Sequence, residues 1–139
     1  GEPAWTYAAG SYVTDVTAAD LDGRPGDEAV KVDDKATIVA TSGGDLLWSA
    51  RADVGDAGTL MAVDSGDIDG DGTEEVAVVG WRYMIGGGVV ELYNGDGTLR
   101  WSRITDGSGE EVRFADLDGD EVLARAPRLR LEPPGGSLL

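Results

Sequence analysis

A repeated acidic motif is the feature that most constrains the fold of this chain. The segment Val-x-x-x-Asp-(Leu/Ile)-Asp-Gly occurs three times, at Val16–Gly23, Val63–Gly70 and Val112–Gly119. Counted from its first aspartate, the motif recurs after 47 and then 49 residues. A period of this length is typical of a repeat architecture, in which each unit buries its apolar face against its neighbours.

A second marker alternates with the acidic motif. Gly-x-Leu-x-Trp occurs at Gly44–Trp48 and Gly97–Trp101, each time between two acidic motifs. Trp5 precedes Asp20 by 15 residues, the same interval that separates the last marker tryptophan from the third acidic motif. Trp5 is therefore predicted to be the tail of a preceding repeat, so that the chain begins in mid-repeat.

Short segments between the markers have strand character. Glu28–Val32 and Glu75–Val79 follow acidic motifs, and Val89–Tyr93 leads into Asn94–Gly97. That last segment is a hairpin signal, because Asn and Gly tolerate positive φ. No segment shows a convincing 3.6-residue apolar period with caps. The sequence therefore predicts an all-β protein.

Several short strands and one tryptophan per period match the blade of a β-propeller. We expect β-propeller-like antiparallel repeats, about two and a half blades, that are partial or are completed by assembly; a Greek-key sandwich is the alternative. The repeats lie near residues 13–48, 60–101 and 109–122 of a domain spanning 1–122. Residues 123–139 are predicted to be a terminal strand or a tail.

The charge of the chain limits its partners. With 27 acidic and 11 basic residues, the formal net charge is −16. Nucleic acids and anionic membranes would repel such a surface, whereas cations would be attracted to it. An acidic surface of the halophilic kind is the alternative origin of this charge. No segment approaches the roughly 20 apolar residues that span a bilayer, so membrane insertion is not expected.

The chain has neither histidine nor cysteine. This excludes disulfides, thiolate metal sites, Ser-His-Asp triads and imidazole-based acid–base catalysis, together with most zinc sites. The remaining metal ligands are oxygen atoms, which suit a hard cation such as calcium.

The second acidic motif is the most complete. Residues 67–75 read Asp-x-Asp-x-Asp-Gly-x-x-Glu. Alternate residues of a tight loop can turn their carboxylates inward, and calcium takes six to eight oxygens at about 2.3–2.6 Å. The alternative is an Asx-turn loop whose aspartates accept hydrogen bonds from backbone amides. Repulsion among four carboxylates in one loop favours the metal. The predicted calcium ligands are Asp67, Asp69, Asp71, Glu75 and the carbonyl of Thr73.

The first and third motifs are less complete. In the first, Asp20, Asp22 and Glu28 keep ligand positions, but Arg24 stands where a third aspartate is expected. Arg24 would either replace the cation or point to solvent beside a weaker calcium site. The third motif lacks about three residues before its closing glutamate. Its candidate ligands are Asp116, Asp118 and Asp120.

The acidic loop followed by a valine-rich strand resembles the FG-GAP/VCBS-type repeats of integrin α-subunit propellers and of many bacterial and archaeal surface proteins. The Gly-x-Leu-x-Trp marker is similar to that of rhamnogalacturonan-lyase-like and quinoprotein-like propellers. The resemblance covers about residues 13–122. It implies a secreted propeller in which calcium occupies loops between strands and serves structure more than catalysis. The sequence departs from the pattern at Arg24, in the short third loop, and in lacking the Phe-Gly and Gly-Ala-Pro signatures.

An insertion in the second repeat carries aromatic side chains. Residues 81–88 make this repeat six residues longer than the first between its acidic motif and its Gly-x-Leu-x-Trp marker. Trp81, Arg82 and Tyr83 could stack on sugar rings or dock a partner. The alternative is a loop whose aromatic rings fold back on the sheet.

These observations predict a non-enzymatic, secreted, calcium-binding structural or adhesion module that self-assembles into a ring or filament. The repeated residues are metal ligands and packing groups, rather than an isolated cluster of acid, base and nucleophile. Expected partners are calcium, further copies of the chain or further repeats of a longer one, and carbohydrate or a cell-surface protein. The alternative function is a fragment of a polysaccharide-acting, lyase-like propeller enzyme or its carbohydrate-binding part.

Overall fold

The computed structural model describes residues 5–24, 26 and 28–105, together with the backbone of three further strands at 111–115, 121–125 and 129–131. Within these residues the chain forms eleven strands and no helix. Accordingly, the described part of the chain offers no helix that is long and apolar enough to cross a membrane. The prediction of an all-β protein is confirmed.

The strands form three antiparallel sheets, each built from consecutive strands in chain order. The first contains β1 (Val13–Ala19), β2 (Glu28–Asp33), β3 (Thr37–Ser42) and β4 (Asp45–Arg51). The second contains β5 (Thr59–Gly66), β6 (Glu75–Trp81), β7 (Gly88–Tyr93) and β8 (Leu99–Thr105). The third contains β9 (Glu111–Ala115), β10 (Glu121–Arg125) and β11 (Leu129–Leu131).

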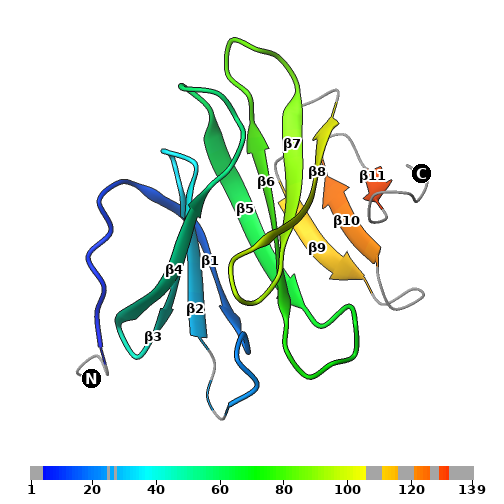
Figure 1. Ribbon diagram of the computed structural model, residues 1–139. Coiled ribbons are helices and arrows are strands. Elements are labelled where there is room, and N and C mark those ends of the chain that lie inside the picture. The colour runs from blue at the N-terminus through cyan, green and yellow to red at the C-terminus, as the bar shows by residue number, and fades with distance from the viewer. Residues whose placement is uncertain are drawn as a thin grey trace.

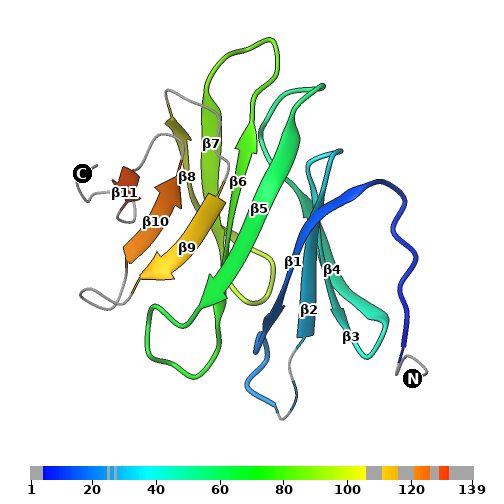
Figure 2. The same cartoon turned by 180° about the vertical axis from the view of Figure 1, so that it is seen from behind.

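The sheets stand side by side like successive blades, with their first strands β1, β5 and β9 adjacent (Figures 1 and 2). Four-stranded antiparallel meanders stacked in this way are the units of a β-propeller. The fold is therefore that of a partial β-propeller, as the repeats predict. The third sheet continues past residue 122, because β10 and β11 reach Leu131.

The second sheet is apolar on both faces, since a neighbouring sheet lies on each side. All residues of β6 except the last are buried. Leu60 and Val76 belong to a core cluster that also contains Val30 of the first sheet. Ala77 and Val79 belong to a second cluster on the opposite face. Alternation of side chains across a strand produces this division, and stacking of the sheets removes both faces from water.

The sequence repeat is also a repeat of strand register. Val30 lies opposite Ala40 in the first sheet, and Ala77 lies opposite Leu92 in the second. Val30 and Ala77 each follow the first aspartate of their acidic motif by ten residues. Residues of one blade can therefore be equated with those of the next.

Polar side chains on β1 connect the first two sheets at their inner edge. Thr14 Oγ1 donates to the carbonyl oxygen of Leu60 at 2.8 Å, and Asp15 Oδ2 accepts from the backbone N–H of Val63 at 3.0 Å. These bonds satisfy backbone groups on β5 that lie at the edge of its own sheet. They help to fix the position of one blade against the next.

We predict that Leu60→Ala lowers the free energy of unfolding by about 2–5 kcal/mol, because the truncation leaves a cavity between the first two blades. Leu60 is 0% exposed. Urea denaturation measures the change. The matched control is Leu46→Ala, at a position that is 54% exposed and where a change below about 0.5 kcal/mol is expected. Equal losses in the two variants would contradict the assignment of the core.

Candidate metal centre

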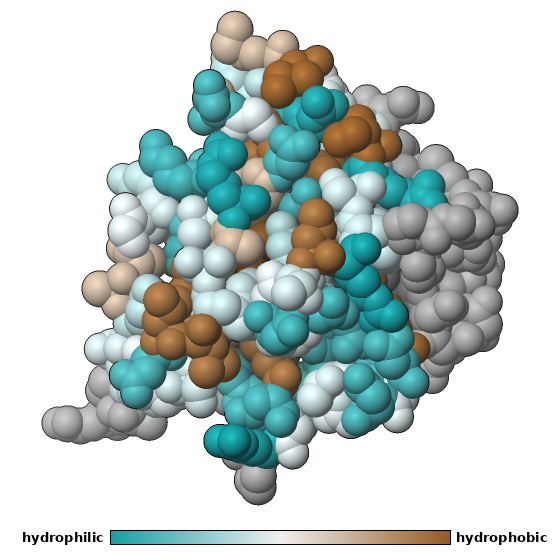
Figure 3. Space-filling model, viewed as in Figure 1, coloured by the Kyte–Doolittle hydropathy of each residue, from teal (hydrophilic) through white to brown (hydrophobic). Residues whose placement is uncertain are grey.

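Two acidic loops lie at the same edge of the molecule. Residues 20–27 connect β1 to β2, and residues 67–74 connect β5 to β6. Both loops project from the lower edge in Figure 1, where the space-filling view in Figure 3 shows mainly hydrophilic surface. They share this position because each joins the first and second strands of its blade.

The β5–β6 loop brings three carboxylates together. One oxygen from each of Asp67, Asp71 and Glu75 lies within 4.8 Å of the others. Two oxygens on opposite sides of one calcium ion are separated by about twice the Ca–O distance, or about 4.8 Å. These three carboxylates, the second-loop trio, are therefore close enough to share one ion.

Asp67 orders the second loop through hydrogen bonds from the backbone. Its Oδ2 accepts from the N–H of Gly72 at 2.9 Å, and its Oδ1 accepts from Gly70 at 2.8 Å and from Asp71 at 3.2 Å. These bonds, with the one from Gly72 contributing most, lower the pKa of Asp67. They are the Asx-turn bonds that the sequence offered as an alternative to a metal. Of these three bonds Oδ2 accepts one, which leaves one of its two lone pairs for coordination of a cation.

Asp69 is paired outside the second-loop trio. Its Oδ2 and Oδ1 accept hydrogen bonds from Nη1 and Nη2 of Arg100 at 2.9 and 2.8 Å. Such a bidentate ion pair fixes the carboxylate in both position and orientation. The sequence placed Asp69 among the calcium ligands, whereas the structure gives its carboxylate to an arginine on β8. The ion pair with Arg100 thus competes with calcium for the carboxylate of Asp69.

Arg100 is a site residue that the sequence did not reveal. It occupies a variable position of the Gly-x-Leu-x-Trp marker and lies 31 residues from Asp69. Its Nη1 is also 3.8 Å from Oε1 of Glu75. The only signal in the sequence was its positive charge beside the marker tryptophan, and nothing local connects that charge to the acidic loop.

Thr73 has a different contact from the one expected of it. Its backbone N–H and its Oγ1 both donate to Oδ1 of Asp71, each at 3.1 Å. The side chain of Thr73 thereby orients one carboxylate of the trio. Coordination by the carbonyl of Thr73 stays a prediction.

Glu75 is the buried member of the second-loop trio, being 2% exposed. Its Oε1 accepts from the backbone N–H of Ile68 at 3.1 Å. Burial raises its pKa to about 7, and the nearby charges of Asp69 and Asp71 act in the same direction. A carboxylate that loses hydration in this way favours either a proton or a cation as its partner.

The β1–β2 loop repeats this arrangement. One oxygen from each of Asp20, Asp22 and Glu28 lies within 4.8 Å of the others, and Glu28 is buried. Oε2 of Glu28 accepts from the N–H of Leu21 at 2.7 Å, the same bond that Glu75 makes with Ile68 in the second loop. We refer to Asp20, Asp22 and Glu28 as the first-loop trio.

Arg24 contributes to the first loop through its backbone. Its N–H donates to Oδ1 of Asp22 at 2.9 Å, and its side chain is exposed. Among the described residues, its guanidinium makes no ion pair with the first-loop trio. Of the two alternatives for Arg24, the geometry favours a side chain that points to solvent over one that replaces the cation.

The two loops are joined directly to each other. The backbone N–H of Glu74 donates to the carbonyl of Asp20 at 2.7 Å, and a carboxylate oxygen of Glu74 accepts from the N–H of Asp20 in return. Gly95 lies against the same place, since a Cβ there would be 2.7 Å from the carbonyl oxygen of Leu21 and 3.0 Å from that of Glu74. Sequence patterns missed Glu74, because its partner is 54 residues away.

The structure describes the aromatic insertion but not the third acidic loop. Asp116, Asp118 and Asp120 lie outside the described residues. The insertion forms a tight turn in which the N–H of Arg82 donates to the carbonyl of Gly87 at 3.0 Å.

The aromatic rings of the insertion contact each other. Trp81 and Tyr83 pack edge to face, with ring centroids 4.9 Å apart, and both remain partly exposed. A role for Trp81, Arg82 and Tyr83 in binding a ligand stays a prediction.

Comparison with known structures identifies the class of fold. BamB from Moraxella catarrhalis is similar at a TM-score of 0.62 and 19% identity, over 98% of this chain and 38% of that one. BBS1N in complex with ARL6DN is similar at a TM-score of 0.62 and 13% identity, over 91% of this chain and 38% of that one. A protein of unknown function from Bacteroides caccae is similar at a TM-score of 0.57 and 17% identity, over 95% of this chain and 46% of that one.

BamB and BBS1N are β-propellers, so the chain has the fold of part of a β-propeller. It spans less than half of the length of each of the three structures. No family model matches the sequence, and no curated protein matches it significantly. The comparisons therefore identify the fold, and any function has to be argued from the residues of the chain itself.

The pKa of Glu75 predicts a pH dependence of stability in the presence of a chelator. Its folded-state pKa of about 7 lies above the ordinary 4.5. The stability contributed by the neutral carboxyl is therefore fully present below about pH 4.5 and is lost as the pH rises through about 7. The variant Glu75→Gln keeps a neutral side chain throughout. We expect its stability relative to wild type to increase from pH 5 to pH 8.

Chemical denaturation of both proteins at these two pH values measures this difference. Comparing the two proteins cancels the titration of the acids that both proteins share. If the two proteins differ in unfolding free energy by the same amount at pH 5 and pH 8, the raised pKa of Glu75 in the folded protein would be contradicted.

Proposed function

We propose that the chain is a non-enzymatic, calcium-stabilised structural module of a β-propeller. The observation that carries the proposal is the recurrence of a carboxylate trio, with one buried glutamate, in two equivalent loops. Exposed acids that cluster by accident have no reason to recur in this form. Each trio offers only oxygen ligands, which suit a hard cation.

An arginine affects one aspartate position in each loop. In the first loop, Arg24 replaces the third aspartate of the motif, so the trio uses the first, third and ninth positions. In the second loop, Arg100 holds Asp69, so the trio uses the first, fifth and ninth positions. Three carboxylates remain in both cases. Water and backbone carbonyls would complete the six to eight oxygens that calcium takes.

Electrostatics supports a bound cation in these loops. Three carboxylates within 4.8 Å repel one another, and the repulsion is stronger where burial lowers the local dielectric constant. The pKa of Glu75 is raised first by burial and then by the nearby charges of Asp69 and Asp71, so its charged form is costly without a partner. A divalent cation would offset the repulsion and would also reduce the net charge of −16.

The position of the loops supports a structural role for the ion. Asp20 belongs to the first-loop trio and is hydrogen-bonded to Glu74, which directly precedes Glu75 of the second-loop trio. An ion in either loop would therefore stiffen the contact between two blades. The resemblance of the acidic loops to FG-GAP/VCBS-type repeats of surface proteins supports the same role.

Secretion is part of the same proposal. A loop with three carboxylates on an exposed edge is suited to weak calcium binding, and extracellular calcium modules bind with dissociation constants of about 10⁻⁴–10⁻³ M. Calcium at such concentrations is a normal component of extracellular fluids rather than of cytosol. A surface or adhesion module is the setting in which these loops would be filled.

We predict that calcium raises the melting temperature of the wild-type protein and that Asp71→Asn removes part of this gain. At a free calcium concentration of 100 times Kd, one site stabilises the folded state by about 2.7 kcal/mol. Thermal unfolding in calcium and in chelator measures the gain. The matched control is Asp56→Asn, which removes the same charge from an exposed aspartate outside both trios. Equal calcium responses in the two variants would refute the site.

We also predict that Arg100→Gln strengthens calcium binding in the second loop. The substitution removes a positive charge 3.8 Å from Glu75 and releases Asp69, which could then act as a fourth carboxylate ligand. One additional carboxylate should lower the apparent Kd several-fold. Titration calorimetry measures it, with Arg51→Gln as a charge-matched control because Arg51 hydrogen-bonds Gly55 away from the acidic loops. Unchanged or weaker binding in Arg100→Gln would count against the role given to Asp69.

A further inference from the structure

The contact between the first two blades includes a tryptophan that lies on a glycine turn. Trp48 on β4 donates from Nε1 to the carbonyl oxygen of Gly95 at 2.9 Å, and its ring stacks on Tyr93 with centroids 6.2 Å apart. A Cβ on Gly97 would be 2.7 Å from Trp48 Cδ2, so only glycine allows this approach. The fourth strand of one blade thus packs on the outer hairpin of the next.

Trp5 stands in the same relation to the first blade. A Cβ on Gly44 would lie 3.3 Å from Cβ of Trp5 and 3.5 Å from its ring. Gly44 and Gly97 are the same position of the Gly-x-Leu-x-Trp marker. Trp5 therefore takes the place, relative to the first blade, that Trp48 takes relative to the second.

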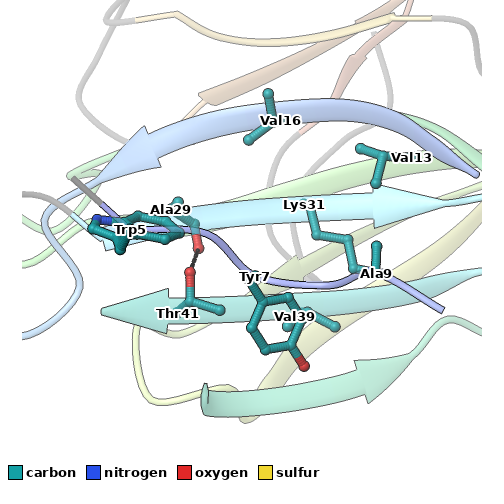
Figure 4. Close-up of a pocket in the computed structure, with 9 residues that line it drawn as sticks. All are labelled: Trp5, Tyr7, Ala9, Val13, Val16, Ala29, Lys31, Val39 and Thr41. Atoms are coloured by element: carbon teal, nitrogen blue, oxygen red, sulfur yellow. Dashed lines mark hydrogen bonds between the residues drawn. The ribbon is translucent and has the colours of Figure 1, made fainter. Parts of the chain in front are cut away.

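The residues that follow Trp5 extend this equivalence. Trp5, Tyr7 and Ala9 all line one cavity against the first sheet, as alternate residues of a strand would. Trp48 and Ala50, two alternate residues of β4, pack in the same way on the core between the first and second sheets. The segment of residues 5–9, which we call the N-terminal segment, crosses the open face of the first sheet (Figure 4). It lies where the fourth strand of a preceding blade would lie.

The N-terminal segment corresponds to only one strand of that preceding blade. The cavity beneath it has a volume of about 250 Å³, and its floor includes Ala29, Lys31, Val39 and Thr41. The ammonium group of Lys31 contacts the Asp33 carboxylate, so the lysine offers mainly its apolar stem to the cavity.

The second blade shows what such a face normally packs against. By register, the four floor residues correspond to Val76, Val78, Glu91 and Tyr93. All four of these are buried, and three of them belong to the core that the first two sheets share. The open face of the first sheet is therefore equivalent to an interface already formed once in this chain. It is suited to three further strands of the same kind.

The third sheet has three strands in the part of the chain that the structure describes. Their order is β11-β10-β9, with β9 beside β5, so β11 is the outer strand. In the two four-stranded sheets, β4 or β8 pairs with the strand equivalent to β11. The buried Nε1 of Trp101, the counterpart of Trp48, also finds no acceptor among the described residues.

We propose that two copies of the chain associate head to tail by completing one blade between them. The N-terminal segment of one copy pairs with β11 of a second copy as its fourth strand. The third sheet of the second copy then covers the open face of the first sheet and fills the cavity. Pairing would give the third sheet the fourth strand that the first two sheets have, and stacking removes apolar surface from water. Such a contact is heterologous, so repetition gives a ring or a filament.

The proposed pairing of the N-terminal segment with β11 uses no residue of either acidic trio. It can therefore be tested in chelator as well as in calcium. The self-repulsion of chains carrying a charge of −16 opposes association, and moderate salt reduces this repulsion. Failure of calcium binding and failure of head-to-tail pairing are thus separate results.

Intermolecular cross-linking tests the pairing directly, because the chain has no cysteine of its own. One preparation of the full chain carries Ala8→Cys and another carries Arg130→Cys. A short bis-maleimide is added to each preparation and to their mixture. We expect a cross-linked dimer in the mixture and little in either preparation alone. Equal cross-linking in all three samples, or none in any, would overturn the proposal.

A charge placed on the open face provides the second test. Val16 lines the cavity and is 61% exposed, so Val16→Asp should not unfold the single chain. The control is Met84→Asp, which introduces the same charge at an 87% exposed position in the β6–β7 turn. We expect sedimentation velocity to show at least a tenfold weaker self-association for Val16→Asp only. A monodisperse wild-type monomer at high concentration, or equal behaviour of the two variants, would refute the proposed interface.

Discussion

Burial of both faces of each sheet is the constraint on which the rest of this structure depends. A strand such as β6, buried along nearly its whole length, cannot be stable in a sheet that stands alone in water. It requires a neighbouring sheet on each side, and the repeat supplies one every 47 to 49 residues. The glycine turns and the marker tryptophans follow from the same requirement, because close stacking of blades leaves room for one large ring only where the opposing residue has no side chain.

Stacking of the blades also decides the electrostatics of the acidic loops. It brings the loop of the first blade against the loop of the second, where Asp20 and Glu74 exchange backbone and side-chain hydrogen bonds. It places Arg100 of β8 over Asp69. A strongly acidic chain thus holds its carboxylates in fixed groups, partly neutralised by arginine and partly available to a cation. Preorganisation of this kind lowers the cost of ordering ligands around an ion.

Much of this architecture could be predicted from the repeats. The spacing of the acidic motifs, the alternating apolar residues and the Asn94–Gly97 turn indicated antiparallel strands in propeller-like blades. The grouping of Asp67, Asp71 and Glu75 also follows from local sequence, since these residues share one tight loop. Glycine at position 95 was expected to serve the conformation of the turn. Its observed role is a close approach to Leu21 and Glu74, which depends on the adjacent blade.

The sequence by itself determined the strands, the turns and the composition of the acidic loops, because these depend on contacts between residues close along the chain. Only the tertiary structure decided which distant residues the acidic side chains of these loops contact. Asp69 pairs with Arg100 across 31 residues, and Asp20 meets Glu74 across 54. Likewise, the repeat suggested the origin of Trp5, but only its position on Gly44 shows which face it covers. Contacts between distant residues depend on how the sheets stack, and a periodic pattern alone does not specify the pairing of side chains across that stack.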